Sequence, residues 1–246
     1  SSFLTMVGVM GYPGGKGRMW QNITALMPPH SVYIETHLGG GAIMRNKRPA
    51  TRNIGVDVDP LVIEAARGWG MSDLQLVEQD AVRFLNSFNF QGGELVYVDP
   101  PYLSSTKKGR RYYRHEYTDE DHGELLETIC ELPCYIMISG YPSSLYEAYL
   151  GRWNHRDFPN VTHGGVREER VWANFVFGAA LHDYKNVGAT YRERERIRRK
   201  ITRWRDRLAS MPHLERNAIM AALLEMEEID RSLMDRIANS RRENAG

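Results

Sequence analysis

Cysteine is scarce in this chain, and so are long hydrophobic runs and any large excess of charge. Only Cys130 and Cys134 occur among the 246 residues, and they form no C-x-x-C pair, so neither a disulfide framework nor a zinc site is indicated. No apolar run has the length that spans a membrane, and no signal peptide precedes the first expected strand. We therefore expect a protein of the reducing cytoplasm that binds neither a metal nor a membrane.

The net charge of +1 points to no polyanionic partner, but the distribution of charge does. Residues 189–246 carry 14 Lys and Arg against 10 Asp and Glu, whereas residues 1–188 carry a net charge of −3. Within the basic part, residues 192–207 hold nine basic and three acidic side chains. Such a segment is either a solvated helix face or a surface for a phosphate backbone.

Short apolar runs alternate with helix-like stretches up to about residue 178, which predicts an α/β fold with a mostly parallel sheet and crossover helices. We expect strands at residues 31–35, 52–58, 74–78, 94–98 and 135–139, and a hairpin from the runs at 153–158 and 170–177. Helices are expected at residues 16–26, 42–46, 60–69, 81–88 and 118–132.

A helical appendage is expected after a boundary at residues 178–188, which divides the chain into a catalytic domain (1–188) and a C-terminal part (189–246). Residues 190–211 and 214–241 predict two helices separated by Met211-Pro212-His213. In the second helix, apolar residues recur every three or four positions at Ile219, Leu223, Met226, Ile229, Leu233 and Ile237. We expect this stripe to be buried against the first helix, the main domain or a second copy of the chain, which would make a homodimer.

Asp99-Pro100-Pro101-Tyr102 is the most informative segment, because it directly follows the strand expected at residues 94–98. Two prolines cannot continue a β-ladder, so a carboxylate and a phenol ring are held at the carboxyl edge of the sheet, where such sheets bind ligands. A carboxylate and a proline carbonyl accept hydrogen bonds from an amino group, and the ring can stack on a flat heterocycle. The segment therefore suits the exocyclic amine of a flipped-out nucleobase, the alternative being a strand that ends in an ordinary turn.

A glycine-rich loop at residues 35–41 (Glu-Thr-His-Leu-Gly-Gly-Gly) follows the first expected strand and precedes a helix. Glycines let a ligand approach the backbone, and the helix start offers free N–H groups. The loop does not complete the G-x-G-x-x-G pattern, so a cofactor loop and a plain glycine turn are equally open at this point.

Acidic residues follow the next two expected strands. Asp57 is placed to bind ribose hydroxyls, whereas Asp59 is placed to cap the helix that begins at Pro60. Asp80 either caps the helix at 81–88 or reaches a ligand. A second glycine-rich segment, Gly-Tyr-Pro-Gly-Gly-Lys at 11–16, is suited to an anionic group but lacks the P-loop pattern.

The order of these elements resembles that of the Dam-like class of N6-adenine DNA methyltransferases. A Gly-Gly-Lys segment comes first, then the glycine-rich loop, an acid after each of the next two strands, and Asp-Pro-Pro-Tyr after the fourth. Residues 160–167 and 169–175 are similar to that family's Asn/Gly/Arg loop and its closing strand. The resemblance covers roughly residues 9–177, although Thr36 and His37 stand where the family has Pro and Phe.

This resemblance implies a Rossmann-like methyltransferase sheet with a C-terminal hairpin, S-adenosylmethionine as cofactor, and transfer of its methyl group to N6 of adenine in DNA. It implies a catalytic segment at Asp99, Pro100, Pro101 and Tyr102. It also implies cofactor binding by Tyr12, Gly15, Lys16, Glu35, His37, Leu38, Gly39, Gly41, Asp57 and Asp80. The family occurs in bacteria and their phages, in restriction–modification and other roles, and its chemistry needs no metal.

One departure from the family is the missing target-recognition insert, because only residues 86–93 separate the third and fourth elements. Two basic segments are candidates for contacting the nucleic acid instead. One is the segment at 192–207. The other follows the catalytic segment and is either a phosphate-binding and base-stacking loop or a solvated charge run, with the side chains of Lys107, Lys108, Arg110, Arg111, Tyr112, Tyr113 and Arg114.

Other functions fit part of the same pattern. An RNA adenine methyltransferase or a cytosine-N4 DNA methyltransferase would use the same chemistry, and a single-stranded substrate would suit a chain without the insert. A non-catalytic module that recruits partners through the helical tail is the alternative from another class. The intact Asp99 and Tyr102 argue against that module.

Overall fold

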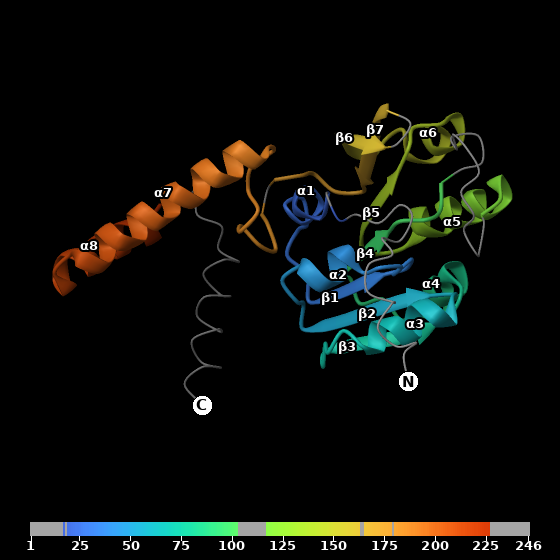
Figure 1. Cartoon of the computed structure of the whole chain (residues 1–246), viewed down its shortest axis with the longest axis horizontal. Helices are drawn as coiled ribbons and strands as arrows, with labels where there is room; N and C mark the ends of the chain where they lie inside the picture. Colours follow the sequence, from blue (N-terminus) through green and yellow to red (C-terminus); the bar gives the residue numbers. More distant parts are fainter. Residues whose placement is uncertain (1–16, 18, 103–116, 163–164, 179, 227–246) are drawn as a thin grey trace, which may run out of the picture.

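A seven-stranded sheet forms the centre of the protein in the computed structural model, with strand order β3-β2-β1-β4-β5-β7-β6 (Figure 1). The structure describes residues 17, 19–102, 117–162, 165–178 and 180–226. The first five strands are parallel, and β7 runs antiparallel between β5 and β6. Their bounds are β1 Val32–Glu35, β2 Arg52–Asp57, β3 Leu74–Glu78, β4 Glu94–Val98, β5 Tyr135–Gly140, β6 Asn154–Thr162 and β7 Gly165–Ala173. This confirms the expected α/β fold, a Rossmann-like sheet with a C-terminal hairpin.

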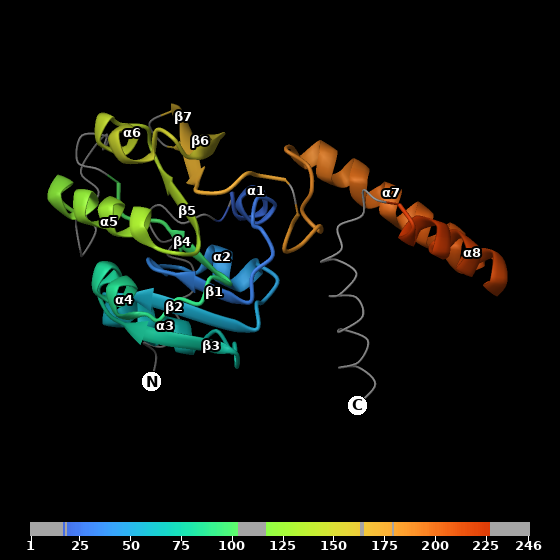
Figure 2. The same cartoon turned by 180° about the vertical axis from the view of Figure 1, so that it is seen from behind.

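Helices cover both faces of the sheet (Figures 1 and 2). One face is covered by α1 Trp20–Thr24, α2 Ala42–Asn46 and α3 Pro60–Arg67. The other is covered by α4 Ala81–Ser87, α5 Asp119–Glu131 and α6 Ser144–Leu150. All five residues of β4 are buried because this strand lies in the middle of the sheet with a helical layer on each side.

Polar caps fix where several helices begin. Asp59 and Asp80 accept hydrogen bonds from the backbone N–H groups of Leu61 and Arg83, which starts α3 and α4. Thr118 and Asp121 form a reciprocal capping box at the start of α5. These caps confirm the sequence signals at Asp59 and Thr118, and they establish the capping role of Asp80.

Several expected boundaries are wrong, and three of them have a local reason. The helix α1 ends at Thr24 rather than residue 26, because its last turn tightens: the N–H groups of Leu26 and Met27 donate to carbonyls three residues back. The strand β6 continues through Pro159, which an edge strand tolerates since its outer N–H groups need no partner. The strand β7 ends at Ala173 because the Ile136 N–H donates to the Asn174 side chain, not to a β7 carbonyl, and that side chain also donates to the Cys134 carbonyl.

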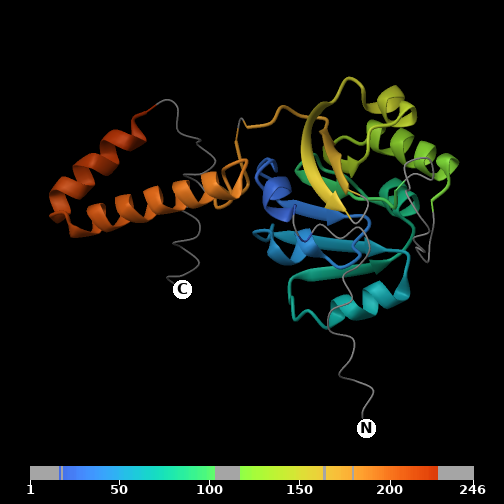
Figure 3. The same cartoon turned by 45° about the horizontal axis from the view of Figure 1, so that its top comes forward.

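Two helices after the sheet form a projecting hairpin, α7 Tyr191–Ser210 and α8 His213–Leu224 (Figure 3). Burial of the apolar stripe of the second helix was expected, but no described residue of α8 is buried. Leu223 is 40% exposed and Met226 is 50% exposed. Ile219 is half-buried, and Ile229, Leu233 and Ile237 lie outside the described residues. No helix among the described residues has the length and apolarity to cross a membrane.

Gly41 supplies a test of how tightly the loop after β1 is packed. Its φ is +65°, and a Cβ there would lie 2.1 Å from the Trp69 ring. Gly70 has a similar φ of +70° but open space around the Cβ position. Gly41→Ala should therefore destabilise the protein by about 1–3 kcal/mol more than Gly70→Ala, because only the first adds a clash to the backbone strain. Equal losses in urea unfolding would show that the Trp69 contact has no cost.

Candidate active site

The carboxyl ends of the parallel strands bring the sequence-predicted residues to one edge of the sheet. Glu35 ends β1, Asp57 ends β2, Asp80 follows β3, and Asp99 follows β4. The strands β1 and β4 are neighbours, although the chain runs from β1 outward to β2 and β3 before it returns to β4. This reversal is a topological switch point, the place where open α/β sheets bind ligands. The glycine-rich loop and the Asp-Pro-Pro-Tyr segment therefore leave adjacent strands.

The glycine-rich loop folds back over β2 and is held there by its backbone. The Leu38 N–H donates to the Val56 carbonyl at 3.0 Å, and the Gly41 N–H donates to the Leu38 carbonyl at 2.8 Å. Gly39 and Gly41 have φ values of +49° and +65°, which favour glycine. Gly55 on β2 leaves room for Leu38, whose side chain would lie 2.8 Å from a Cβ at that position.

Asp57 orients this loop through its carboxylate. Its Oδ2 accepts a hydrogen bond from the Gly39 N–H at 2.9 Å, and its Oδ1 accepts one from the Asp59 N–H at 2.9 Å. The carboxylate is therefore fixed in orientation beside the loop, and each of its oxygens can accept more than one hydrogen bond. Asp57 and Asp59 thus differ in role, since Asp59 caps α3 with its own side chain.

Glu35 is a buried carboxyl group, 3% exposed, at the end of β1. The Tyr33 hydroxyl donates a hydrogen bond to Glu35 Oε2 at 3.1 Å. Desolvation raises the pKa of Glu35 to about 8, against the lowering effect of that bond, and the charge of Asp99 raises it further. Burial thus favours the protonated, neutral form of Glu35, which lessens the repulsion between Glu35 and Asp99.

His37 links the glycine-rich loop to the start of α5, a contact that the sequence did not predict. Its Nδ1 and the Thr36 hydroxyl lie 2.9 Å apart, and its Nε2 lies 2.9 Å from the Tyr117 hydroxyl. Desolvation lowers the pKa of His37 to about 3, so the ring is neutral, with one nitrogen donating and the other accepting. Tyr117 directly precedes Thr118, the N-cap of α5. Apolar and aromatic residues before an N-cap often pack against neighbouring residues, and this position was the one signal that Tyr117 makes a contact.

A shallow, open pocket lies beside the Asp-Pro-Pro-Tyr segment. Its walls are Pro100, Pro101, Tyr102, Ser139, Gly140, Tyr141 and Tyr146. The rings of Tyr102 and Tyr141 are 4.8 Å apart between centroids and tilted by 42°. Sequence analysis missed Tyr141 and Tyr146, because nothing in the run after β5 marks these rings as neighbours of Tyr102.

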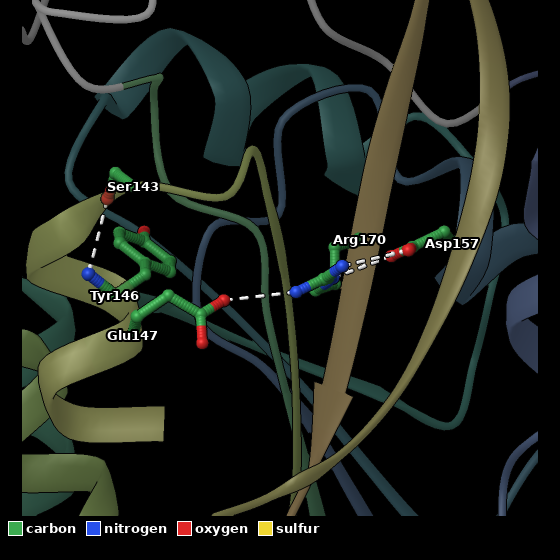
Figure 4. A network of polar contacts seen from close by, with 5 residues as sticks. All are labelled: Ser143, Tyr146, Glu147, Asp157 and Arg170. Carbon is green, nitrogen blue, oxygen red and sulfur yellow. Dashed lines mark hydrogen bonds and ion pairs between the residues drawn. The ribbon is translucent and has the colours of Figure 1, made fainter. Parts of the chain in front are cut away.

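A charged network supports the wall of this pocket (Figure 4). Arg170 on β7 donates to both carboxylate oxygens of Asp157 on β6, at 2.6 and 2.8 Å, and to Glu147 Oε1 on α6 at 3.0 Å. Hydrogen bonding to Arg170 lowers the pKa of Asp157. The helix α6, capped by Ser143, carries Tyr146 as well as Glu147, so the network ties the hairpin to the helix that holds a pocket residue.

Ten sequence-predicted side chains lie outside the described residues. They are three candidates for the cofactor and seven for the nucleic acid: Tyr12, Gly15, Lys16, Lys107, Lys108, Arg110, Arg111, Tyr112, Tyr113 and Arg114. Among the described residues, no group of three His, Cys, Asp or Glu side chains is placed to hold a metal ion.

Comparison with known proteins finds no matching family model and no matching curated protein. Among solved structures, a precorrin 8W decarboxylase of Methanobacterium thermoautotrophicum is 12% identical, with a TM-score of 0.43 over 67% of this chain and 94% of that one. The 23S rRNA methyltransferase ErmE is 11% identical, with a TM-score of 0.42 over 72% and 80%. The putative methyltransferase SMU.776, complexed with SAH, is 12% identical, with a TM-score of 0.45 over 64% and 48%. At these values no function follows from the likeness, so function is inferred from the residues of this chain.

The pKa of His37 predicts part of the acid sensitivity of the fold. Because its folded pKa of about 3 lies below the unfolded value of about 6.5, the unfolded chain takes up the proton first as the pH falls. The folded state should therefore lose up to about 1.4 kcal/mol per pH unit from this group below about pH 6.5. His37→Asn cannot take up that proton, so urea unfolding between pH 7 and 4 should show a shallower loss than in the wild type. The matched control His155→Asn, at an exposed position on β6, should follow the wild type, and parallel curves for all three proteins would contradict the assignment.

Proposed function

We propose that this protein transfers a methyl group from S-adenosylmethionine to the N6 amino group of adenine in DNA, acting on a flipped-out base. The observation that carries the proposal is the position of Asp99-Pro100-Pro101-Tyr102. It leaves β4 at the switch point, beside the glycine-rich loop of β1 and against a pocket walled by three tyrosines. Two ligands that must meet, a cofactor and a base, would thus have adjoining places at one sheet edge.

The residues that would hold the cofactor fit its chemistry. Asp57 presents a fixed carboxylate for the ribose hydroxyls, and the loop at Gly39 and Gly41 lets the ligand lie close to the backbone. Asp80 caps α4 through Oδ1, which leaves its other oxygen for the ligand. Bound S-adenosylmethionine supplies an activated methyl group on a positively charged sulfur.

The residues that would hold the base supply acceptors and flat surfaces. The lone pair of the adenine amino group is conjugated with the ring, which makes it a poor nucleophile. Acceptance of its two N–H bonds by the Asp99 carboxylate and the Pro100 carbonyl would favour a nitrogen whose lone pair is free to attack. Stacking on Tyr102 would contribute on the order of 1–3 kcal/mol to base binding, and it would hold the nitrogen in line with the methyl group.

The direct test is the modified base itself. Purified protein incubated with DNA and S-adenosylmethionine should yield N6-methyldeoxyadenosine after digestion to nucleosides, detected by mass spectrometry. Both duplex and single-stranded DNA serve as substrates in this experiment. Methylation of cytosine in place of adenine would overturn the assignment of the substrate. So would methylation of RNA alone when DNA and RNA of the same sequence are both supplied.

Asp99→Ala should lower methyl transfer by at least about 100-fold, because the target amine loses an acceptor that positions it. Binding of S-adenosylmethionine should stay close to that of the wild type, since Asp99 is assigned to the base. Tritium transfer and calorimetry measure the two properties separately. Glu64→Gln, an exposed change on α3, is the control and should retain both. Turnover near the wild-type rate in Asp99→Ala would remove Asp99 from the mechanism.

Asp57→Ala should weaken the binding of S-adenosylmethionine by about 1.5–3 kcal/mol, the typical worth of charge-assisted hydrogen bonds. Asp59→Ala is a matched control, because it removes the neighbouring carboxylate and the cap of α3 but no group assigned to the ribose. It should cost about 1 kcal/mol of folding stability with little change in the dissociation constant. Calorimetric titrations in which both variants bind equally would show that Asp57 acts only on the loop.

A further inference from the structure

The helix α7 carries exposed basic residues that have no part in the proposed catalytic site. It begins at the Thr190 cap and is anchored to the main domain by Arg194, whose guanidinium donates to Asn22 Oδ1 at 2.7 Å and to the Gly188 carbonyl at 3.1 Å. From that anchor the helix leads away from the sheet (Figures 1 and 3). Its twenty residues are continuous, so any surface on it has a defined shape.

Six basic residues of α7 lie on one side of the helix. They follow one another at spacings of three or four residues, apart from one adjacent pair, which places them within about 100° of the helix circumference. All six are exposed, and from first to last they extend over about 22 Å at a rise of 1.5 Å per residue. We name this surface the cationic stripe, made of Arg192, Arg196, Arg199, Lys200, Arg203 and Arg207.

The acidic residues of α7 do not neutralise this stripe. Glu193 accepts a hydrogen bond from the Ala189 N–H, and Glu195 pairs with Arg198, which lies off the stripe. The third acidic residue, Asp206, lies three residues after Arg203 at the border of the stripe, where it offsets part of the charge at that end. In the part of the chain that the structure describes, no member of the stripe forms an ion pair. Like charges three and four residues apart destabilise a helix. The arrangement therefore stores repulsion that an anionic partner would relieve.

We propose that the cationic stripe binds the phosphate backbone of the DNA substrate, an inference that rests on the proposed function. Each strand of duplex DNA carries one phosphate per about 3.4 Å of helix axis, so a stripe of this length can face several phosphates of a duplex. Arginine supplies five of the six cations, and its planar guanidinium matches phosphate oxygens. The contact reads no sequence; it supplies affinity and holds the nucleic acid near the catalytic edge.

The test compares two variants that remove equal charge. The stripe variant changes Arg196, Arg199, Lys200 and Arg203 to Gln. The control variant changes Arg67, Arg152, Lys185 and Arg205 to Gln, all of them exposed, with Arg205 on the opposite side of α7. Circular dichroism and the affinity for S-adenosylmethionine should be equal in both, because neither set includes a residue assigned to the cofactor.

Binding of fluorescein-labelled duplex and single-stranded DNA is measured by anisotropy over a range of salt concentrations. In the stripe variant, the slope of log affinity against log salt should become shallower by about 0.9 for each lost phosphate contact on duplex, or about 0.7 on a single strand. The control variant should keep the wild-type slope. A stripe variant with the wild-type slope would overturn the proposal. So would a loss of affinity that light scattering traces to a changed oligomeric state.

Failure of the stripe and failure of the proposed function give different results. If the wild type methylates adenine but the stripe variant binds DNA like the control, the proposed role of the cationic stripe is wrong and the proposed function stands. If the stripe variant alone loses salt-dependent DNA binding while no methylated adenine is found, the stripe stands and the catalytic assignment is wrong.

Discussion

The position of β1 between β2 and β4 determines which loops and side chains lie together at the carboxyl edge of the sheet. Its register pairs Glu35 with Gly55 on one side and with Tyr97 on the other, so the loop after β1 begins level with the ends of both neighbours. Asp57 then bonds the loop from the β2 side, and Asp99 lies on the β4 side. A slip of one residue in either pairing would move these carboxyl groups relative to the loop and turn alternate side chains to the other face.

Burial changes the pKa values of the ionisable groups at this edge of the sheet. Behind Glu35, Lys47 is 6% exposed and its ammonium lies 4.5 Å from the centre of the Tyr33 ring. Desolvation lowers the pKa of Lys47 to about 7, while it raises that of Glu35. An acid and a base that would both be charged in water are thus brought toward neutrality beneath the site. Asp99, at the edge itself, is a partly exposed carboxyl group.

The sequence alone predicted the parts of the fold that local patterns encode. The strands at Leu74–Glu78 and Glu94–Val98 have the expected bounds, and the caps at Asp59 and Thr118 are the expected ones. The helix α6 was missed, although the Ser143 cap directly before it was an available signal. The bond between His37 and Tyr117 joins residues 80 positions apart, and no local pattern encodes such a pair. The same holds for Tyr102 and Tyr141, which meet only because β4 and β5 are neighbours.

The proline in β6 has a consequence for how the protein meets copies of itself. An edge strand with unpaired N–H groups can accept a strand from another molecule, the first step of sheet-to-sheet aggregation. Pro159 removes one of those donors, and the neighbouring charged residues Arg156 and Asp157 are unsuited to a packed strand interface. This end of the sheet is thereby protected against extension into a continuous intermolecular sheet.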